Sequence, residues 1–252
     1  LGTRLAEETG VRPKPMVEIG GRPILWHIMK TYLAHGVDEV IVCCGYKGYV
    51  IKEYFANYCL HLSDVTFDFS DGSMRVHQKK AESWKVTLVD TGEHTQTGGR
   101  VKRVREYIGD STFCMTYGDG VGDIDISAAL QFHRTHQKLA TMTAVQPPGR
   151  FGALVMEQDR IIDFTEKPVG DGGWINGGYF FFRREFLKYV TTEESCVLEQ
   201  EPLMRLARDR QLSIHKHRGF WYAMDTQRDR EHLNKLWDAG NAPWNVGAGV
   251  CP

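Results

Sequence analysis

The sequence predicts an α/β fold, a doubly wound, mostly parallel sheet of the Rossmann type with β-rich additions. Short β-branched runs such as 38–44 (DEVIVCC) alternate with segments of helical periodicity, a pattern typical of parallel strands joined by crossover helices. The stretches 63–90 and 151–183 are instead rich in strand-forming residues and supply the additions. Ligands of such a fold bind at the carboxyl ends of its strands.

The elements follow from periodicity and from start and stop signals along the chain. Pro23 suits the first turn of a helix over 22–35, and a glycine pair opens the helix over 98–108. The turn signal SDGS separates two strands within 64–78, so we expect a β-hairpin there, followed by a strand at VTLVD. Further helices are expected over 49–62, 126–137, 199–209 and 226–238, and further strands over 111–120, 140–147, 212–218 and 220–224.

One domain over 1–252 is expected, because no repeat, low-complexity tract or linker interrupts the chain. Its net charge of −1 offers no broad attraction to nucleic acid or anionic lipid, and no apolar run approaches the roughly 18 residues of a membrane span. The six cysteines lack a C-x-x-C pair or zinc spacing. Buried thiols in a reducing cytoplasm are therefore expected.

The opening stretch, LGTRLAEETGVRPKPM, concentrates cations in a short segment. Gly2-Thr3-Arg4 could form a tight turn whose backbone N–H groups face a phosphate, with Arg4 as a charged arm. Prolines on both sides of Lys14 predict a stiffened, extended segment that holds its ammonium in place, which suits phosphoryl chemistry. A solvated loop with ordinary surface cations is the alternative.

Two aspartates end strands that precede turns or helices. Asp119 lies in TYGDG and Asp225 in FWYAMDT. Carboxylates at two strand ends could share one Mg²⁺ together with substrate phosphates. The alternatives are a turn residue for Asp119 and an N-cap or first-turn acid for Asp225.

Three further stretches could contact a nucleotide or a sugar. In FTEKP, Lys167 could contact a phosphate, and Glu166 could accept hydrogen bonds from the hydroxyl groups of a sugar. WINGGYF places the Asn176 amide beside glycine backbone that a sugar ring could approach closely. In TQTGGR, glycines and Arg100 at a helix start could receive a flat base. A salt-bridged strand end, a glycine bulge and a solvated helix face are the alternatives.

Taken in order, LGTRL, RPKPM, a GD at a strand end, EKP, INGG and a late MD resemble the sugar-nucleotide pyrophosphorylases over almost the whole chain. The resemblance implies a nucleotidyltransferase sheet and Mg²⁺ as cofactor. RPKPM, TYGDGVGDIDI and GFWYAMDT are most similar to members that use CTP and glucose 1-phosphate and form CDP-glucose. Use of UTP or dTTP, or a catalytically silent regulatory subunit of the same fold, are the alternatives.

The resemblance also assigns roles to individual residues. It implies Lys14 and Arg4 as catalytic residues and Asp119 and Asp225 as metal ligands. The implied nucleotide contacts are Leu1, Gly2, Thr3, Arg4, Lys14, Thr95, Arg100 and Gly120. The implied sugar-phosphate contacts are Glu166, Lys167, Asn176 and Gly178, all within a sugar-binding β region at about 151–183.

Assembly and context are likewise implied by the resemblance. It implies a homo-oligomer, a hexamer with trimer contacts in a β-rich segment, and a role in making dideoxysugars of a bacterial surface polysaccharide. Family members carry a strand and an Ala-Gly-Gly ahead of the position of Leu1. Longer sequence before Leu1 is therefore expected, and a chain that began there would be expected to fold poorly and show little activity.

Overall fold

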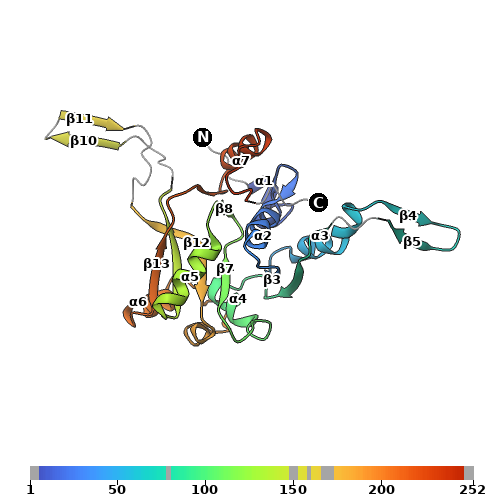
Figure 1. Ribbon diagram of the computed structural model, residues 1–252, viewed down its shortest axis with the longest axis horizontal. Coiled ribbons are helices and arrows are strands. Elements are labelled where there is room, and N and C mark those ends of the chain that lie inside the picture. Colours follow the sequence, from blue (N-terminus) through green and yellow to red (C-terminus); the bar gives the residue numbers. More distant parts are fainter. Residues whose placement is uncertain (1–5, 78–80, 148–152, 158–159, 166–172, 247–252) are drawn as a thin grey trace.

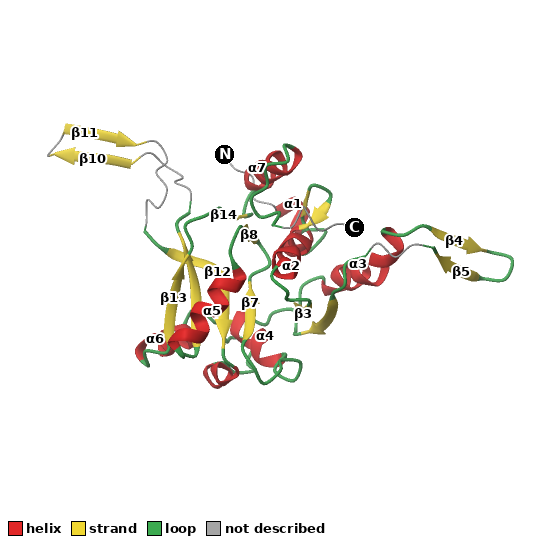
Figure 2. Cartoon of the chain, viewed as in Figure 1, coloured by secondary structure: helices red, strands yellow, loops and turns green. Residues whose placement is uncertain are grey.

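The computed structural model describes residues 6–77, 81–147, 153–157, 160–165 and 173–246. Within these ranges helices and strands alternate along the chain, as the sequence predicts (Figure 2). The helical segments are α1 (Ala6–Thr9), the 3-10 turn η1 (Lys14–Met16), α2 (Ile24–Ala34), α3 (Gly48–His61), α4 (Thr97–Arg103), α5 (Ile126–His136), the 3-10 turn η2 (Arg184–Tyr189), α6 (Glu201–Arg208) and α7 (Gln227–Asp238). The strands are β1 (Glu18–Ile19), β2 (Arg22–Pro23), β3 (Glu39–Cys44), β4 (Val65–Asp68), β5 (Ser73–Val76), β6 (Lys85–Asp90), β7 (Phe113–Thr116), β8 (Gly120–Gly122), β9 (Ala140–Val145), β10 (Ala153–Glu157), β11 (Arg160–Thr165), β12 (Ile175–Phe182), β13 (Leu212–Lys216) and β14 (Trp221–Ala223).

The main sheet contains β13, β9, β12 and β7 in that order, and β3 and β6 form a separate parallel pair. Between β3 and β6 the chain passes through α3 and the hairpin β4/β5, which is the long crossover that parallel neighbours require. β13 is parallel to β9, whereas β12 is antiparallel to both of its neighbours. The sequence predicted only a β-rich stretch over 151–183, which carried no information about the direction of β12.

The direction of β12 brings its amino end to the carboxyl end of β7. Tyr179 lies opposite Thr116, the last residue of β7. The pairing of β12 with β9 is irregular between Asn176 and Phe180, so the glycine pair forms a bulge, with Gly178 at a φ of 77°. Asn176 and the glycines are thereby placed at the edge of the sheet where β7 ends.

The core lies on both faces of β12, whose side chains alternate between two hydrophobic clusters. Tyr179 and Phe181 pack with Val17, Ile19 and other residues of one cluster, and Phe180 and Phe182 belong to the other. A strand that buries both faces is apolar throughout, as the run YFFF is. Packing on both faces of β12 fixes the position of its amino end, where Asn176 and the glycines lie.

Two hairpins project from the body on opposite sides (Figure 1). β4 and β5 pair antiparallel, as the SDGS turn signal predicts, and β10 and β11 form the second hairpin. The hairpin β4/β5 and its turn carry exposed apolar side chains that belong neither to the hydrophobic clusters nor to the pocket described below. These are Phe67, Phe69 and Met74.

Some boundaries differ from the sequence prediction. The helix expected over 22–35 begins at Ile24, because Arg22 and Pro23 pair with β1 across Gly20 and Gly21, both at positive φ. The helix expected over 98–108 ends at Arg103 and continues as turns.

The prediction of buried thiols is wrong for Cys59, which faces solvent on α3 next to buried Tyr58. Cys44 is buried, and Cys43, Cys114 and Cys196 are half-buried. Over the described ranges, no helix has the length and apolar character to span a membrane.

Candidate functional site

Lys14 lies between two carboxylates that come from distant parts of the chain. Its Nζ donates to Asp119 Oδ2 at 2.8 Å and to Asp225 Oδ1 at 2.7 Å. Pro13 is extended, with φ −67° and ψ 151°, but the extended backbone predicted at Lys14 is wrong, because Lys14 opens the 3-10 turn η1. The lysine and both strand-end aspartates singled out in the sequence therefore meet at one place.

The two aspartates converge because β8 and β14 pair antiparallel. Asp119 directly precedes β8, and Gly120 lies opposite Ala223 at the end of β14. The backbone N–H of Met224 donates to the carbonyl of Asp119 at 2.8 Å and extends this pairing. Asp225 follows by one residue, so both side chains leave the backbone at the same end of the strand pair.

Asp225 precedes the N-cap of α7 instead of forming it. Thr226 is the N-cap: its hydroxyl accepts from the N–H of Asp229, whose carboxylate accepts from the N–H of Thr226 at 2.8 Å. Asp229 also accepts from the N–H of Asp225 at 3.1 Å. The helix start therefore fixes the backbone of Asp225 and leaves its carboxylate directed at Lys14.

The charge state of Lys14 follows from two opposing effects. Burial lowers its pKa, but the charges and hydrogen bonds of Asp119 and Asp225 outweigh burial, so the pKa lies above its usual value. The side chain is therefore a full ammonium at neutral pH, which suits it to contact an anion.

The two aspartates are the candidate metal ligands at this site. In the part of the chain that the structure describes, no group of three or more His, Cys, Asp or Glu side chains is arranged to hold a metal ion. A cation bound by Asp119 and Asp225 would need its remaining ligands from bound phosphate oxygens or water. Mg²⁺ is commonly held by that combination.

A small pocket begins at Asp119 and extends over the amino end of β12. Its lining consists of Tyr117, Asp119, Gly120, Asn176, Gly177, Gly178, Tyr179 and Trp221. The Asn176 amide oxygen accepts from the N–H of Gly178 at 2.8 Å, and its amide nitrogen lies 3.4 Å from the Tyr117 hydroxyl. A Cβ on Gly178 would lie 2.7 Å from the Tyr117 ring, so glycine keeps this wall of the pocket open. The site therefore continues from the charged cluster to an amide and bare backbone.

Sequence reasoning missed a hydrogen-bonded chain beside this pocket. The Tyr117 hydroxyl donates to Glu199, and the hydroxyl of Thr97 donates to the same carboxylate at 2.7 Å. Burial, followed by the hydrogen bond and charge of Glu199, raises the pKa of Tyr117. Tyr117 is part of the motif TYGDG, but Glu199 lies 82 residues further along the chain. No local sequence pattern predicts a contact between two residues so far apart.

Thr95 and Arg100 lie near the carboxyl ends of β3 and β6, and their polar groups bond within the protein. Arg100 donates to the Cys44 carbonyl at 3.2 Å, to the Thr91 hydroxyl at 2.7 Å and to the Glu93 carbonyl at 3.1 Å. The Thr95 hydroxyl accepts from Arg103 at 2.7 Å. These contacts order the start of α4, and nucleotide contacts by Thr95 and Arg100 stay a prediction.

Several predicted site residues lie outside the described residues. These are Leu1, Gly2, Thr3, Arg4, Glu166 and Lys167. The described part of the candidate site is therefore Lys14, Asp119 and Asp225 with the pocket beside them.

Comparison with known proteins places the chain among nucleotide-transferring enzymes. The family model of nucleotidyl transferases matches residues 1–222. The chain is 57% identical over 247 residues to a glucose-1-phosphate cytidylyltransferase of Salmonella typhi, covering 98% of this chain and 96% of that protein. It is 27% identical to a mannose-1-phosphate guanyltransferase of Hypocrea jecorina, covering 93% of this chain and 60% of the relative.

Solved structures share the fold. The crystal structure of HddC from Yersinia pseudotuberculosis is similar with a TM-score of 0.65 at 22% identity, covering 94% of this chain and 95% of that chain. The α/β fold of the Rossmann-like type predicted from the sequence is thereby confirmed.

Proposed function

Because the chain belongs to the nucleotidyl transferase family, we propose that it transfers CMP from CTP to α-D-glucose 1-phosphate, giving CDP-glucose and pyrophosphate. The choice of substrates is supported by the 57% identity to a relative named for this reaction. The observation that best supports phosphoryl transfer at this site is the Lys14 ammonium held between Asp119 and Asp225. With Mg²⁺ bound to the two carboxylates, the cluster would carry a net positive charge and could gather polyanions at one point.

The proposed reaction is an in-line displacement at the α-phosphorus of CTP. An oxygen of glucose 1-phosphate attacks, and pyrophosphate leaves from the opposite side with the electron pair of the broken P–O bond. The attacking phosphate is already an anion, so no general base is needed. The protein has to bring two polyanions together and stabilise the charge that develops on the transferred phosphoryl group.

Lys14 is the residue proposed to contact the α-phosphate during transfer. Its raised pKa keeps it positively charged, and the flanking prolines limit how far it can move. Arg4, with the backbone of Leu1, Gly2 and Thr3, is proposed to hold the β- and γ-phosphates. Thr95, Arg100 and Gly120 are proposed to lie along the nucleoside.

Asp119 and Asp225 are proposed to hold Mg²⁺. The donor set fits this ion, because two carboxylates already converge on one cationic group and leave further positions to phosphate and water. When bound there, Mg²⁺ supplies neutralisation of the phosphate charge. Lys14 and the ion would then share the two carboxylates, which ties the ammonium to the position of the phosphate.

The pocket over the amino end of β12 is proposed to receive the glucose. The Asn176 side chain and the open backbone at Gly178 support this assignment, because a pyranose needs both polar partners and close approach. Glu166 is proposed to bind sugar hydroxyls. Lys167 is proposed to orient the attacking phosphate.

The exposed apolar hairpin β4/β5 is proposed as a contact between copies of the chain. Phe69 is 93% exposed, Phe67 54% and Met74 51%, which is unusual for groups of this size. A homo-oligomer, and specifically a hexamer, would cover these side chains.

The function is tested by pyrophosphate release from CTP, UTP or dTTP with glucose 1-phosphate and Mg²⁺. We expect kcat/KM with CTP to exceed that with either other nucleotide by at least about 10-fold, the scale of one specific contact. Equal or faster release with UTP or dTTP would contradict the proposed substrate. Binding of CTP by calorimetry with no release from any nucleotide would instead indicate a catalytically silent subunit.

A further inference from the structure

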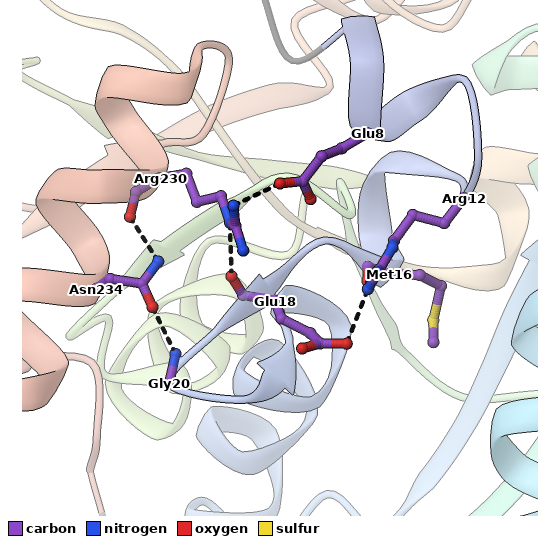
Figure 3. Close-up of polar contacts among 7 residues, drawn as sticks. All are labelled: Glu8, Arg12, Met16, Glu18, Gly20, Arg230 and Asn234. Carbon is purple, nitrogen blue, oxygen red and sulfur yellow. Dashed lines mark hydrogen bonds and ion pairs between the residues drawn. The ribbon is translucent and has the colours of Figure 1, made fainter.

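The segment that carries Lys14 is closed into a loop by one arginine of α7. Arg230 Nη1 contacts the carboxylate of Glu8 in α1, and Arg230 Nε donates to the carbonyl of Glu18 in β1 at 3.2 Å (Figure 3). Glu8 and Glu18 stand before and after Lys14, so a single guanidinium joins both ends of this loop. Fixing the ends of a loop restricts every residue within it.

A second arginine, Arg12, lies within this loop and forms contacts that also restrict it. Arg12 Nη1 donates to the Glu18 carboxylate at 2.8 Å and lies 3.4 Å from the Met16 carbonyl (Figure 3). Met16 itself is 4% exposed, and it anchors the far side of η1 in the core. Lys14 thus projects from a short turn whose two flanks are both held.

The same helix also holds Asp225. The first turn of α7 fixes the backbone of Asp225 through Asp229, and the neighbouring residue Arg230 fixes the loop of Lys14. One turn further on, the amide oxygen of Asn234 accepts from the N–H of Gly20 at 2.9 Å, and its nitrogen donates to the Arg230 carbonyl at 2.9 Å (Figure 3). α7 therefore acts as one rigid element to which the carboxylate and the ammonium are both attached.

We infer that Arg230 is a positioning residue, which sets the Lys14 ammonium against Asp225 by closing the Glu8–Glu18 loop on α7. The inference rests on the proposed function insofar as Lys14 acts on the transferred phosphate. Partly exposed ion pairs such as Arg230–Glu8 contribute little to the free energy of unfolding. The proposed role of Arg230 is therefore to fix the position of the loop that carries Lys14. Displacement of a catalytic group by about 1 Å can cost as much as 100-fold in rate.

Arg230→Ala is expected to lower kcat for pyrophosphate release by about 10-fold, with KM for CTP and glucose 1-phosphate changed less than about twofold. Arg230→Lys should recover only part of the loss, because one ammonium cannot replace the two donors that face Glu8 and Glu18. Arg228→Ala is the matched control: Arg228 is exposed on the same helix and should leave kcat unchanged. Normal kcat in Arg230→Ala would overturn the inference.

A double-substitution cycle separates positioning from general support of the fold. If Arg230 acts through Lys14, adding Arg230→Ala to Lys14→Ala should cause no further loss of kcat. An equal loss in both backgrounds would assign Arg230 a structural role and overturn the inference.

A readout without turnover keeps this test apart from the proposed function. Lysines labelled with ¹³C at Cε give NMR signals, and the signal of Lys14 is the one lost in Lys14→Arg. We expect that signal to sharpen and shift in Arg230→Ala, as the freed side chain samples more conformations, and to be unchanged in Arg228→Ala. An unchanged Lys14 signal in Arg230→Ala would overturn the inference. If the unsubstituted protein releases no pyrophosphate from CTP, the proposed function fails while the NMR result still decides the role of Arg230.

Discussion

At the scale of single residues, Lys14 is the group whose charge the proposed chemistry uses most directly. It is the cation that bridges Asp119 and Asp225, and it sits on a segment stiffened by two prolines. An ammonium that meets charge developing in the transition state should affect kcat more than KM.

Lys14→Ala should therefore lower kcat by roughly 10² to 10³, the scale of a lost transition-state donor. The measurement is steady-state pyrophosphate release with CTP and glucose 1-phosphate. Lys235→Ala, an exposed lysine on α7, serves as the control and should retain full turnover. Near-normal kcat in Lys14→Ala would remove this residue from the proposed chemistry.

Two histidines that do not belong to the charged cluster are buried as neutral rings. His27 is 2% exposed, with Nε2 donating to the Ile19 carbonyl at 2.8 Å and Nδ1 accepting from Trp244 Nε1 at 3.3 Å. His133 is fully buried, with Nδ1 2.8 Å from the Thr141 hydroxyl. Burial lowers the pKa of each ring to about 4.

These shifts predict a loss of stability in acid. Above about pH 6.5 both rings are neutral whether the chain is folded or unfolded, so their full contribution is present. Between pH 6.5 and 4 the unfolded chain binds protons that the folded protein does not, and stability falls. From pH 7.5 to 5.0 the loss should be about 2 kcal/mol per histidine, measured by urea unfolding.

Substitution identifies the histidines responsible. His133→Gln should show a smaller difference in unfolding free energy between pH 7.5 and 5.0, whereas His61→Gln, at an exposed position, should show the full difference. The same pH dependence in His133→Gln as in the unsubstituted protein would contradict the assignment.

At the scale of elements, α7 depends on its first turn. Thr226 and Asp229 cap each other in a reciprocal pair of hydrogen bonds, and the same turn holds the backbone of Asp225. The first turn of α7 therefore stabilises the helix and also holds the backbone of Asp225, a proposed metal ligand.

Thr226→Ala should lower the free energy of unfolding by about 1 kcal/mol, because the N–H of Asp229 loses its acceptor. It should also raise the Mg²⁺ concentration needed for half-maximal turnover, since Asp225 is less firmly held. Thr226→Ser retains the hydroxyl and should preserve both quantities. A loss in Thr226→Ser equal to that in Thr226→Ala would argue that the methyl group, not the cap, matters.

Elements were predictable where local pattern determines them. The β-branched run of β3, the SDGS turn of β4/β5 and the periodicity of α5 are all local signals, and each element formed close to its expected bounds. The start of α2 was displaced because Arg22 and Pro23 pair with β1, a contact that helical periodicity cannot reveal.

The site was predictable to the same extent. Lys14, Asp119 and Asp225 stood out by local pattern, between prolines or at a strand end, but each pattern had an ordinary alternative, and it was the family resemblance that implied their roles. Arg230 could not be singled out, since a cation on an amphipathic helix has the same pattern whether it faces solvent or a loop 212 residues away. The partnership of Tyr117 and Glu199 was hidden for the same reason.

At the scale of the whole molecule, the exposed apolar groups on β4/β5 lead to a prediction about assembly. Replacing Phe67, Phe69 and Met74 together by serine should reduce the mass measured by light scattering from that of an oligomer toward that of one chain. Replacing exposed Lys85 and Glu39 by serine, which removes a surface ion pair elsewhere, is the control and should leave the mass unchanged. An unchanged mass after the triple substitution would contradict an interface at this hairpin.

The central claim is that the cluster of Lys14, Asp119 and Asp225 directs attack to the α-phosphorus of CTP. The most direct measurement follows ³²P from α-labelled and γ-labelled CTP in the presence of glucose 1-phosphate and Mg²⁺. We predict that the α-label appears in CDP-glucose and the γ-label in pyrophosphate, both at a rate that falls together in Lys14→Ala. Release of the γ-label as inorganic phosphate, with no label in a sugar nucleotide, would contradict the claim.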